Sequence, residues 1–156
     1  MNPLAHFMIT YIVLDAFIPN CFEYILPIAF FSMVLDIDHL PGFLKLFHLP
    51  KTKVAKLTVH DMVNMFRSAV QEPIGIFTIE MLLAFLYIYG VNDVLLSIAS
   101  VAIFTHWLVD FFTVHTKPFV PLDDRIVCFF FKTERQRAIS ELVITIISTV
   151  VFLIIL

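Results

Sequence analysis

Apolar residues fall into five long segments, separated by connections that are polar or contain proline. The segments cover residues 3–18, 22–36, 73–90, 94–115 and 138–156. Each is continuously apolar rather than alternating, which is typical of buried helices and not of half-exposed strands. Prolines and Gly90 stand mostly at the segment ends, where helices begin or stop. The pattern predicts an all-α protein with about five long helices.

A different pattern precedes the third segment, in residues 58–73. Apolar residues recur there at helical spacing, with polar residues between them: Val59, Met62, Val63, Phe66 and Val70. This spacing predicts an amphipathic helix that lies at a membrane surface. Residues 126–137, an aromatic cluster followed by a cationic end, indicate a second interfacial element. Ordinary packing at an interface explains both stretches equally well.

The composition identifies lipid as the surroundings of these helices. Sixty per cent of the residues are hydrophobic, 15% are charged, and the mean hydropathy is +0.95. A soluble chain of 156 residues could not enclose so much apolar surface in one core. We therefore expect one integral membrane domain over residues 1–156. It is a helical bundle with about five transmembrane helices and one or two interfacial amphipathic helices. The net charge of -3, without a basic stripe, argues against a nucleic-acid partner.

Basic residues orient the predicted bundle. The connections at 41–60 and 116–137 are rich in lysine and arginine, whereas the short ones at 19–21 and 91–93 contain neither. In membrane proteins the cytoplasmic loops carry the excess of these residues. We therefore predict a multi-pass protein of the plasma (inner) membrane, with its N-terminus in the cytoplasm and its C-terminus outside.

Ionisable side chains collect at the cytoplasmic ends of the predicted helices. Charged groups are costly in a membrane, so each of them is a candidate functional residue. The predicted topology places a set from distant parts of the chain in one layer: His6, Asp36, Asp38, His39, Arg67, Gln71, Glu72, His106 and Asp110.

The spacing within this layer suits a metal ion. His106 and Asp110 are four residues apart and Asp36 and His39 are three apart, so each pair shares one face of a helix. Imidazoles combined with carboxylates bind Zn²⁺, Mn²⁺ or Fe²⁺. We predict a divalent metal, zinc before manganese or iron, with this ligand pool: His6, Asp36, His39, His106 and Asp110. The alternatives are a helix end that meets water for Asp36 and simple packing for His6.

Several of these residues match a known family. An N-terminal histidine, "DIDH" after the second helix, an arginine before the third and "HWLVDFFTVHTKPFVPLDDR" resemble small inner-membrane proteins described as membrane-bound metal-dependent hydrolases. Some members of that family are under LexA control. The resemblance covers about residues 5–125, and these positions match: His6, Asp36, Asp38, His39, Arg67, His106 and Asp110. It implies metal-dependent hydrolysis. The family's loose link to zinc-dependent phospholipase C implies a phosphoester substrate by analogy.

The segment "FRSAVQEP" departs from the family pattern. It keeps Arg67 but has Phe66 and Gln71 where histidines are expected. Either Glu72 or His60 replaces a ligand here, or one metal position is lost.

The resulting hypothesis is a membrane-embedded hydrolase that acts on a phosphoester, such as a lipid headgroup, at the cytoplasmic interface. The metal would supply hydroxide, Asp38 or Glu72 would orient a ligand or act as general base, and Arg67 would bind the phosphate. Two alternatives remain open. One is a cation-binding or transport protein, in which Glu80 and Asp15 continue the polar path. The other is a structural membrane protein without catalysis.

Overall fold

The structure is a computed structural model that describes residues 2–54, 56–66, 68–113, 115–120, 122–123, 125–127, 130–131 and 133–156. Within these residues the regular structure is helical throughout. The one β-type pairing there is an isolated bridge between Thr116 and Val127. The predicted all-α class is therefore confirmed.

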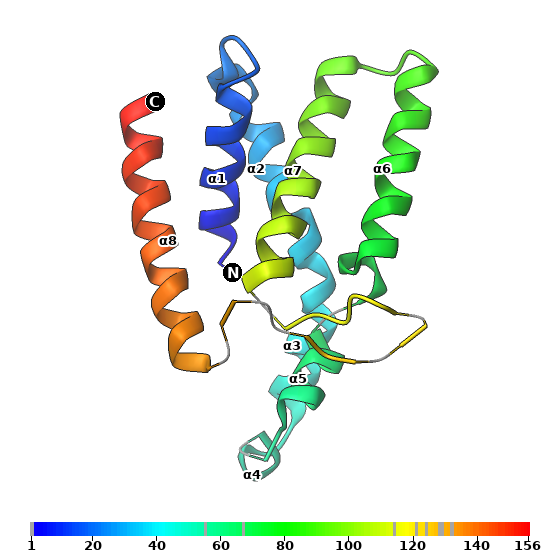
Figure 1. Cartoon of the computed structure of the whole chain (residues 1–156), viewed down its shortest axis with the longest axis vertical. Coiled ribbons are helices and arrows are strands. Elements are labelled where there is room, and N and C mark those ends of the chain that lie inside the picture. The colour runs from blue at the N-terminus through cyan, green and yellow to red at the C-terminus, as the bar shows by residue number, and fades with distance from the viewer. Residues whose placement is uncertain are drawn as a thin grey trace.

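The long helices stand side by side as a bundle (Figure 1). They are α1 (Pro3–Asp15), α2 (Ile25–Met33), α6 (Pro73–Ile88), α7 (Asp93–Thr113) and α8 (Glu134–Ile155). Helix α7 contacts α1, α2 and α6, while α8 packs against α1. Side chains on α7 can therefore meet side chains from several other helices.

Capping residues explain where several helices begin. The side chain of Asn2 accepts a hydrogen bond from the Ala5 amide at 2.8 Å, and Pro3 follows as the first residue of α1. Thr133 and Gln136 form a reciprocal capping box at the start of α8. This cap makes α8 begin at Glu134, earlier than the predicted residue 138.

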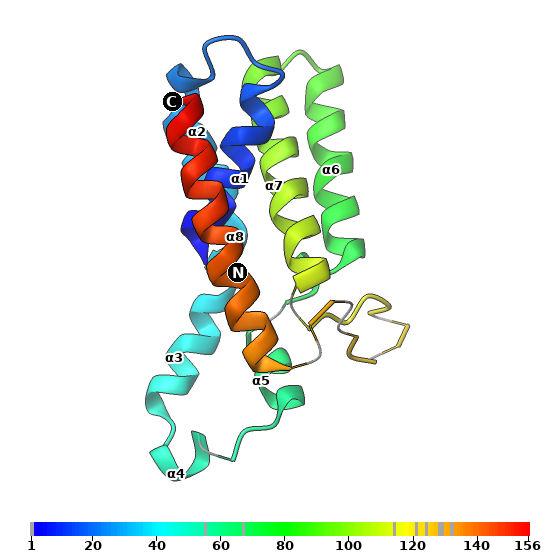
Figure 2. The ribbon, with the colours of Figure 1, turned by 60° about the vertical axis from the view of Figure 1, so that its left-hand side comes forward.

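Short elements connect the long helices: η1 (Cys21–Tyr24), η2 (Val34–His39), α3 (Leu40–His48), α4 (Lys51–Val54), α5 (Val59–Phe66) and η3 (Ala69–Gln71). The predicted second helix is thus divided into a 3-10 turn, α2 and a second 3-10 segment. Elements α3, α4 and α5 extend beyond one end of the bundle (Figure 2).

The predicted amphipathic helix over 58–73 is present in part. Helix α5 ends at Phe66, and a separate 3-10 turn begins at Ala69. The side chain of Ser68 caps this turn by accepting a hydrogen bond from the Val70 amide at 3.2 Å. In the second predicted interfacial stretch, the described residues before Glu134 are not helical.

Among the described residues, two helices are long and apolar enough to cross a membrane. Residues Asp93–Thr113 have a mean hydropathy of 1.8 and Arg135–Ile155 one of 2.5. Helices α1 and α6 are apolar but shorter, with 13 and 16 residues, against the ~20 usual for a crossing. Membrane association therefore has support, while the number of five crossings stays a prediction.

The surface of the bundle is also apolar. Large hydrophobic side chains are exposed along α6 and α8: Phe77, Met81, Leu82, Phe85, Leu142, Ile146, Ile147 and Ile154. Soluble proteins rarely expose apolar patches that extend along whole helices. Contact with lipid would account for the exposed apolar faces of these two helices.

The two ends of the bundle differ in charge. The N-terminal end of α1, the lysine-bearing helices α3 and α4 with α5, and the described residues between α7 and α8 lie at one end (Figure 1). The C-terminus and the short turns after α1 and α6 lie at the other. The apolar core stops near the basic end. Buried Leu35 directly precedes Asp36 in η2, and buried Ile103 lies three residues before His106 in α7.

Candidate metal centre

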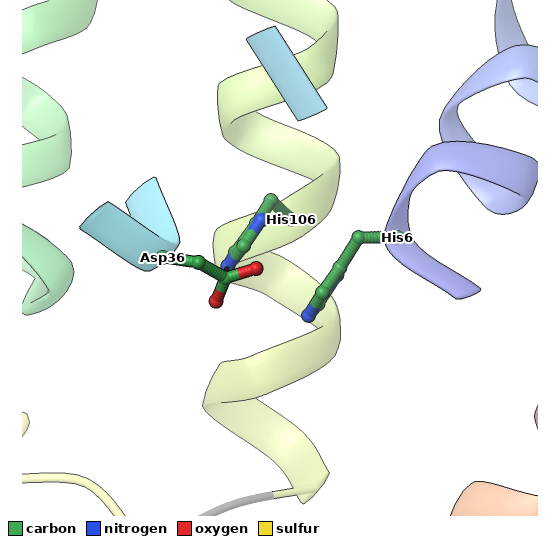
Figure 3. Close-up of side chains that lie close together, drawn as sticks. All are labelled: His6, Asp36 and His106. Carbon is green, nitrogen blue, oxygen red and sulfur yellow. Dashed lines mark ion pairs between the residues drawn. The ribbon is translucent and has the colours of Figure 1, made fainter. Parts of the chain in front are cut away.

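Three of the predicted ligands converge between α1, η2 and α7. His6, Asp36 and His106 each offer one ligand atom, and these atoms lie within 4.8 Å of one another. Figure 3 shows the three side chains pointing toward a common place from separate elements. Both histidines are 1% exposed. Residues from three distant parts of the chain thus form one group, with both histidines buried and Asp36 half-buried.

Small residues allow the helices to approach closely enough for this. Ala5 precedes His6 on α1, and Ala102 lies one turn before His106 on α7; both are 0% exposed. Small side chains at a helix contact let the backbones come close together. Because residues four apart share one face of a helix, Ala102, His106 and Asp110 all point toward α1 and η2.

The hydrogen bond of His106 determines which of its ring nitrogens is available to bind a metal ion. Its Nδ1 lies 2.6 Å from the carbonyl oxygen of Ser32, which can only accept, so Nδ1 carries the proton. Its Nε2 then keeps a lone pair and lies 3.6 Å from Oδ1 of Asp36. Metal-binding histidines commonly donate their other ring N–H to a backbone carbonyl in this way.

The two histidine rings are stacked in parallel. Their centroids are 3.7 Å apart and their planes differ by 6°. Among the described residues, several buried polar atoms around them have no hydrogen-bond partner, namely Nδ1 of His6, Nε2 of His106 and Oδ2 of Asp36. Leaving a buried polar atom unsatisfied costs about 1–3 kcal/mol. One bound cation would satisfy nitrogen and oxygen atoms together, so the residues present fit a metal ion.

Asp110 joins the same group from α7. Its Oδ1 lies 3.2 Å from Nε2 of His6, and its Oδ2 lies 3.8 Å from Nε2 of His106. Asp110 is 4% exposed. The structure therefore places this carboxylate against both histidines, as the spacing of His106 and Asp110 required.

His39 contacts the same carboxylate oxygen of Asp36 as His106 does. Its Nε2 is 3.7 Å from Oδ1 of Asp36, and its Nδ1 is 3.1 Å from Oδ1 of Asp38 and donates to the carbonyl of Phe66. Burial by itself lowers the pKa of His39. Hydrogen bonds to Asp38 and Phe66, with the charges of Asp38 and Asp36, outweigh it and raise that pKa above its usual value. All five predicted ligands are thus linked by contacts.

Asp38 is held by side chains from the segment before α6. Ser68 Oγ donates to one of its carboxylate oxygens at 2.6 Å, and Gln71 Nε2 donates to the other at 2.7 Å. Gln71 also donates to the Leu35 carbonyl at 2.9 Å and is 2% exposed. The hydrogen bonds of Gln71 therefore connect η2 to η3. In the sequence Gln71 belongs to the polar layer and stands where the family pattern has a histidine, but neither pattern predicts its contact with Asp38.

The other predicted catalytic residues lie elsewhere or outside the described part. Glu72 is 2% exposed and its Oε1 accepts a hydrogen bond from the Lys117 amide at 3.0 Å. This hydrogen bond therefore connects the start of α6 to the segment after α7. Arg67 lies outside the described residues, as does the side chain of His60.

A cavity of about 570 Å³ lies beside the ligand group. His39 and Asp110 belong both to the ligand group and to the cavity wall. The rest of the wall is mainly apolar, but it includes Arg137 and Glu141 of α8. Ligand sites commonly have volumes of about 300–1,000 Å³. In the sequence Arg137 is one of several basic residues at 116–137, and no local signal distinguishes it from the others.

Comparison with known proteins gives no match: no family model, no curated protein and no solved structure matches this chain. The resemblance to metal-dependent hydrolases therefore rests on the sequence motifs alone and stays a hypothesis.

Proposed function

We propose that this chain is a membrane protein that binds a divalent metal ion through His6, Asp36 and His106 and uses it to hydrolyse a phosphoester. The observation that carries the proposal is the convergence of His6, Asp36 and His106 next to a cavity, with several of their buried polar atoms lacking a hydrogen-bond partner among the described residues. A metal there would have both protein ligands and access to a substrate.

The donor set supports zinc as the metal. Two imidazole nitrogens with one carboxylate form a recurrent catalytic zinc site, in which a fourth position stays open for water. Manganese and iron bind similar ligands. When bound, such a metal lowers the pKa of its water to about 7 and supplies hydroxide at neutral pH.

Residues of this chain would position that chemistry. Asp110 contacts both histidines and also lines the cavity, so it is placed to complete the ligand set or to hold a proton of the water. His39 contacts Asp36, one of the three proposed metal ligands, and also lines the cavity. Asp38 orients His39 through its ring nitrogen. Phosphate binding by Arg67 and a catalytic role of Glu72 remain proposals from the sequence.

The location of the site suggests where the substrate arrives. The ligands lie near the end of the bundle that also carries the basic α3–α5 elements, and we assign that end to the cytoplasm (Figure 1). In this orientation the protein crosses the inner membrane about five times, and its cavity lies at the depth of lipid headgroups. A lipid phosphoester is therefore the proposed substrate.

Cation transport has less support. Glu80 accepts a hydrogen bond from Ser100 at 2.5 Å, beside a second cavity of about 280 Å³ between α6 and α7. The residues that line this second cavity do not include any of the five predicted metal ligands. Asp15, the other expected step of a polar path, is exposed at the end of α1. These positions favour a separate interhelical contact for Glu80.

Metal analysis of the purified protein tests the proposal. We expect stoichiometric zinc in the wild type after loading, and hydrolysis of a chromogenic phosphodiester that chelation abolishes. His106→Ala and Asp36→Ala should lose both, with membrane insertion retained, because each change makes the segment more apolar. His48→Ala is the matched control, since His48 is exposed and its ring bonds the Leu44 carbonyl of its own helix, away from the proposed ligands. A wild type that holds no metal after loading refutes the proposal.

A further inference from the structure

One wall of the cavity beside the metal ligands is formed by α8. Arg137, Glu141 and Ile144 line it, and their spacing of four and three residues puts them on one face of the helix. Phe43 and Met62, from α3 and α5, line the same cavity. The N-terminal part of α8 descends toward these elements (Figure 2).

Arg137 is the basic side chain of α8 that faces this space. It is half-buried, whereas Arg135, two residues earlier on the same helix, is exposed and is not part of the wall. A guanidinium group binds phosphate through two parallel hydrogen bonds and is the preferred residue for phosphate recognition. Arg137 is therefore positioned to meet an anion inside the cavity.

The charged groups around the cavity make anion binding depend on the metal. Asp110 and Glu141 also line the wall, so their carboxylates oppose an anion in the metal-free protein. A divalent ion held by His6, Asp36 and His106 would offset this repulsion next to Asp110. A phosphate that lies between the metal and Arg137 would then be attracted from two directions.

The remaining wall suits hydrocarbon rather than water. Phe43, Leu46, Met62 and Ile144 contribute apolar side chains. A small water-soluble phosphate would leave this surface in contact with water, whereas an acyl chain would bury it, and burial of apolar surface favours binding. The volume of about 570 Å³ also exceeds what a phosphate alone requires.

We infer that the ligand of this cavity is an anionic phospholipid: Arg137 binds its phosphate beside the metal, and acyl-chain carbons lie along the apolar wall between α3, α5 and α8. The inference rests on the proposed function and narrows its substrate class, a lipid phosphoester, to an anionic phospholipid. It makes α8, which lies beyond the motifs that resemble the hydrolase family, the element that selects the substrate.

Lipid binding by the purified protein tests this inference independently of hydrolysis. Delipidated, zinc-loaded protein in detergent is titrated with dioleoyl phosphatidate, dioleoyl phosphatidylcholine or inorganic phosphate, and bound ligand is counted by native mass spectrometry. We expect phosphatidate to bind most tightly. Arg137→Gln should weaken phosphatidate binding by at least about tenfold, as expected for loss of a charge-assisted contact. Arg135→Gln, the matched control, should leave it unchanged.

A second variant separates the acyl chain from the phosphate, and it serves also if Arg137→Gln does not fold. Ile144→Trp fills the apolar part of the cavity, so it should weaken phosphatidate binding without changing the metal content. Equal phosphatidate binding by Arg137→Gln and Arg135→Gln overturns the inference, as does inorganic phosphate that binds as tightly as the lipid. In either case, metal content and phosphodiester hydrolysis still decide the proposed function separately. A protein that takes up no zinc but still binds lipid through Arg137 would refute the proposed hydrolase function. The lipid site at Arg137 would then stand without the metal.

Discussion

His106 donates a hydrogen bond from Nδ1 to the carbonyl oxygen of Ser32 at 2.6 Å. This bond joins α7 to the last turn of α2 and directs Nε2 of the ring toward Asp36, the third residue of the following 3-10 segment. One contact therefore sets both the distance between two helices and the orientation of a proposed ligand. Four predictions follow from this arrangement and its surroundings.

Replacement of Gln71 should loosen the ligand group without removing a ligand. Gln71→Leu deletes the donor to Asp38 and to the Leu35 carbonyl, and unsatisfied buried acceptors cost about 1–3 kcal/mol. We expect lower thermal stability and zinc affinity reduced by about tenfold, within the 10–100-fold range for groups that orient ligands. Isothermal titration with zinc measures the affinity. Val70→Ala, at an exposed neighbouring position, is the control, and equal affinities in both variants would contradict the role of Gln71.

Gly42→Ala should destabilise the protein, although alanine normally favours a helix by about 0.5–1 kcal/mol over glycine. A Cβ at Gly42 would lie 2.5 Å from the Met65 carbonyl oxygen and 2.7 Å from Cδ1 of Phe66. Helix α3 would have to move away from α5, at a cost of about 1–3 kcal/mol. Thermal unfolding in detergent measures this effect. Lys45→Ala on the same helix is the control, and a higher melting temperature for Gly42→Ala would disprove the close contact.

His39 should bind its proton more tightly than a free histidine in the metal-free protein. Asp38, the Phe66 carbonyl and Asp36 raise its pKa above the ordinary value of about 6.5. Because the folded-state pKa is the higher one, the stabilisation is complete below about pH 6.5 and is lost as the pH rises through the folded-state value. NMR titration of the imidazole in the presence of a chelator measures the pKa. A value at or below 6.5 for His39 would rule out these contacts.

The basic end of the bundle should face the cytoplasm. With the native cysteines replaced, Lys53→Cys should be protected from an impermeant thiol reagent in intact cells, and Tyr89→Cys should react. These positions lie at opposite ends of the bundle, in α4 and after α6. A C-terminal tag should be accessible from outside, in keeping with an odd number of crossings. The reverse labelling pattern would invert the topology but keep the metal group intact.

Local sequence determined most of the helices. The apolar segments and the starts set by Pro3 and Pro73 predicted helices whose bounds mostly agree with the structure within a few residues. The same local geometry predicted that His106 and Asp110 share one face, because residues four apart on a helix always do. The breaks at Met33 and Phe66 were missed, since the apolar pattern continues across both positions.

Only the tertiary structure decided which residues meet. Helices that are apolar on all sides carry little information about the face that turns inward, so the sequence could not predict the stacking of His6 on His106, which are far apart along the chain. It likewise could not place Gln71 against Asp38, or Arg137 in the cavity wall. These contacts depend on how each helix is rotated and how closely it packs. Side chains such as Ala5 and Ala102 set that geometry only after the helices have come together.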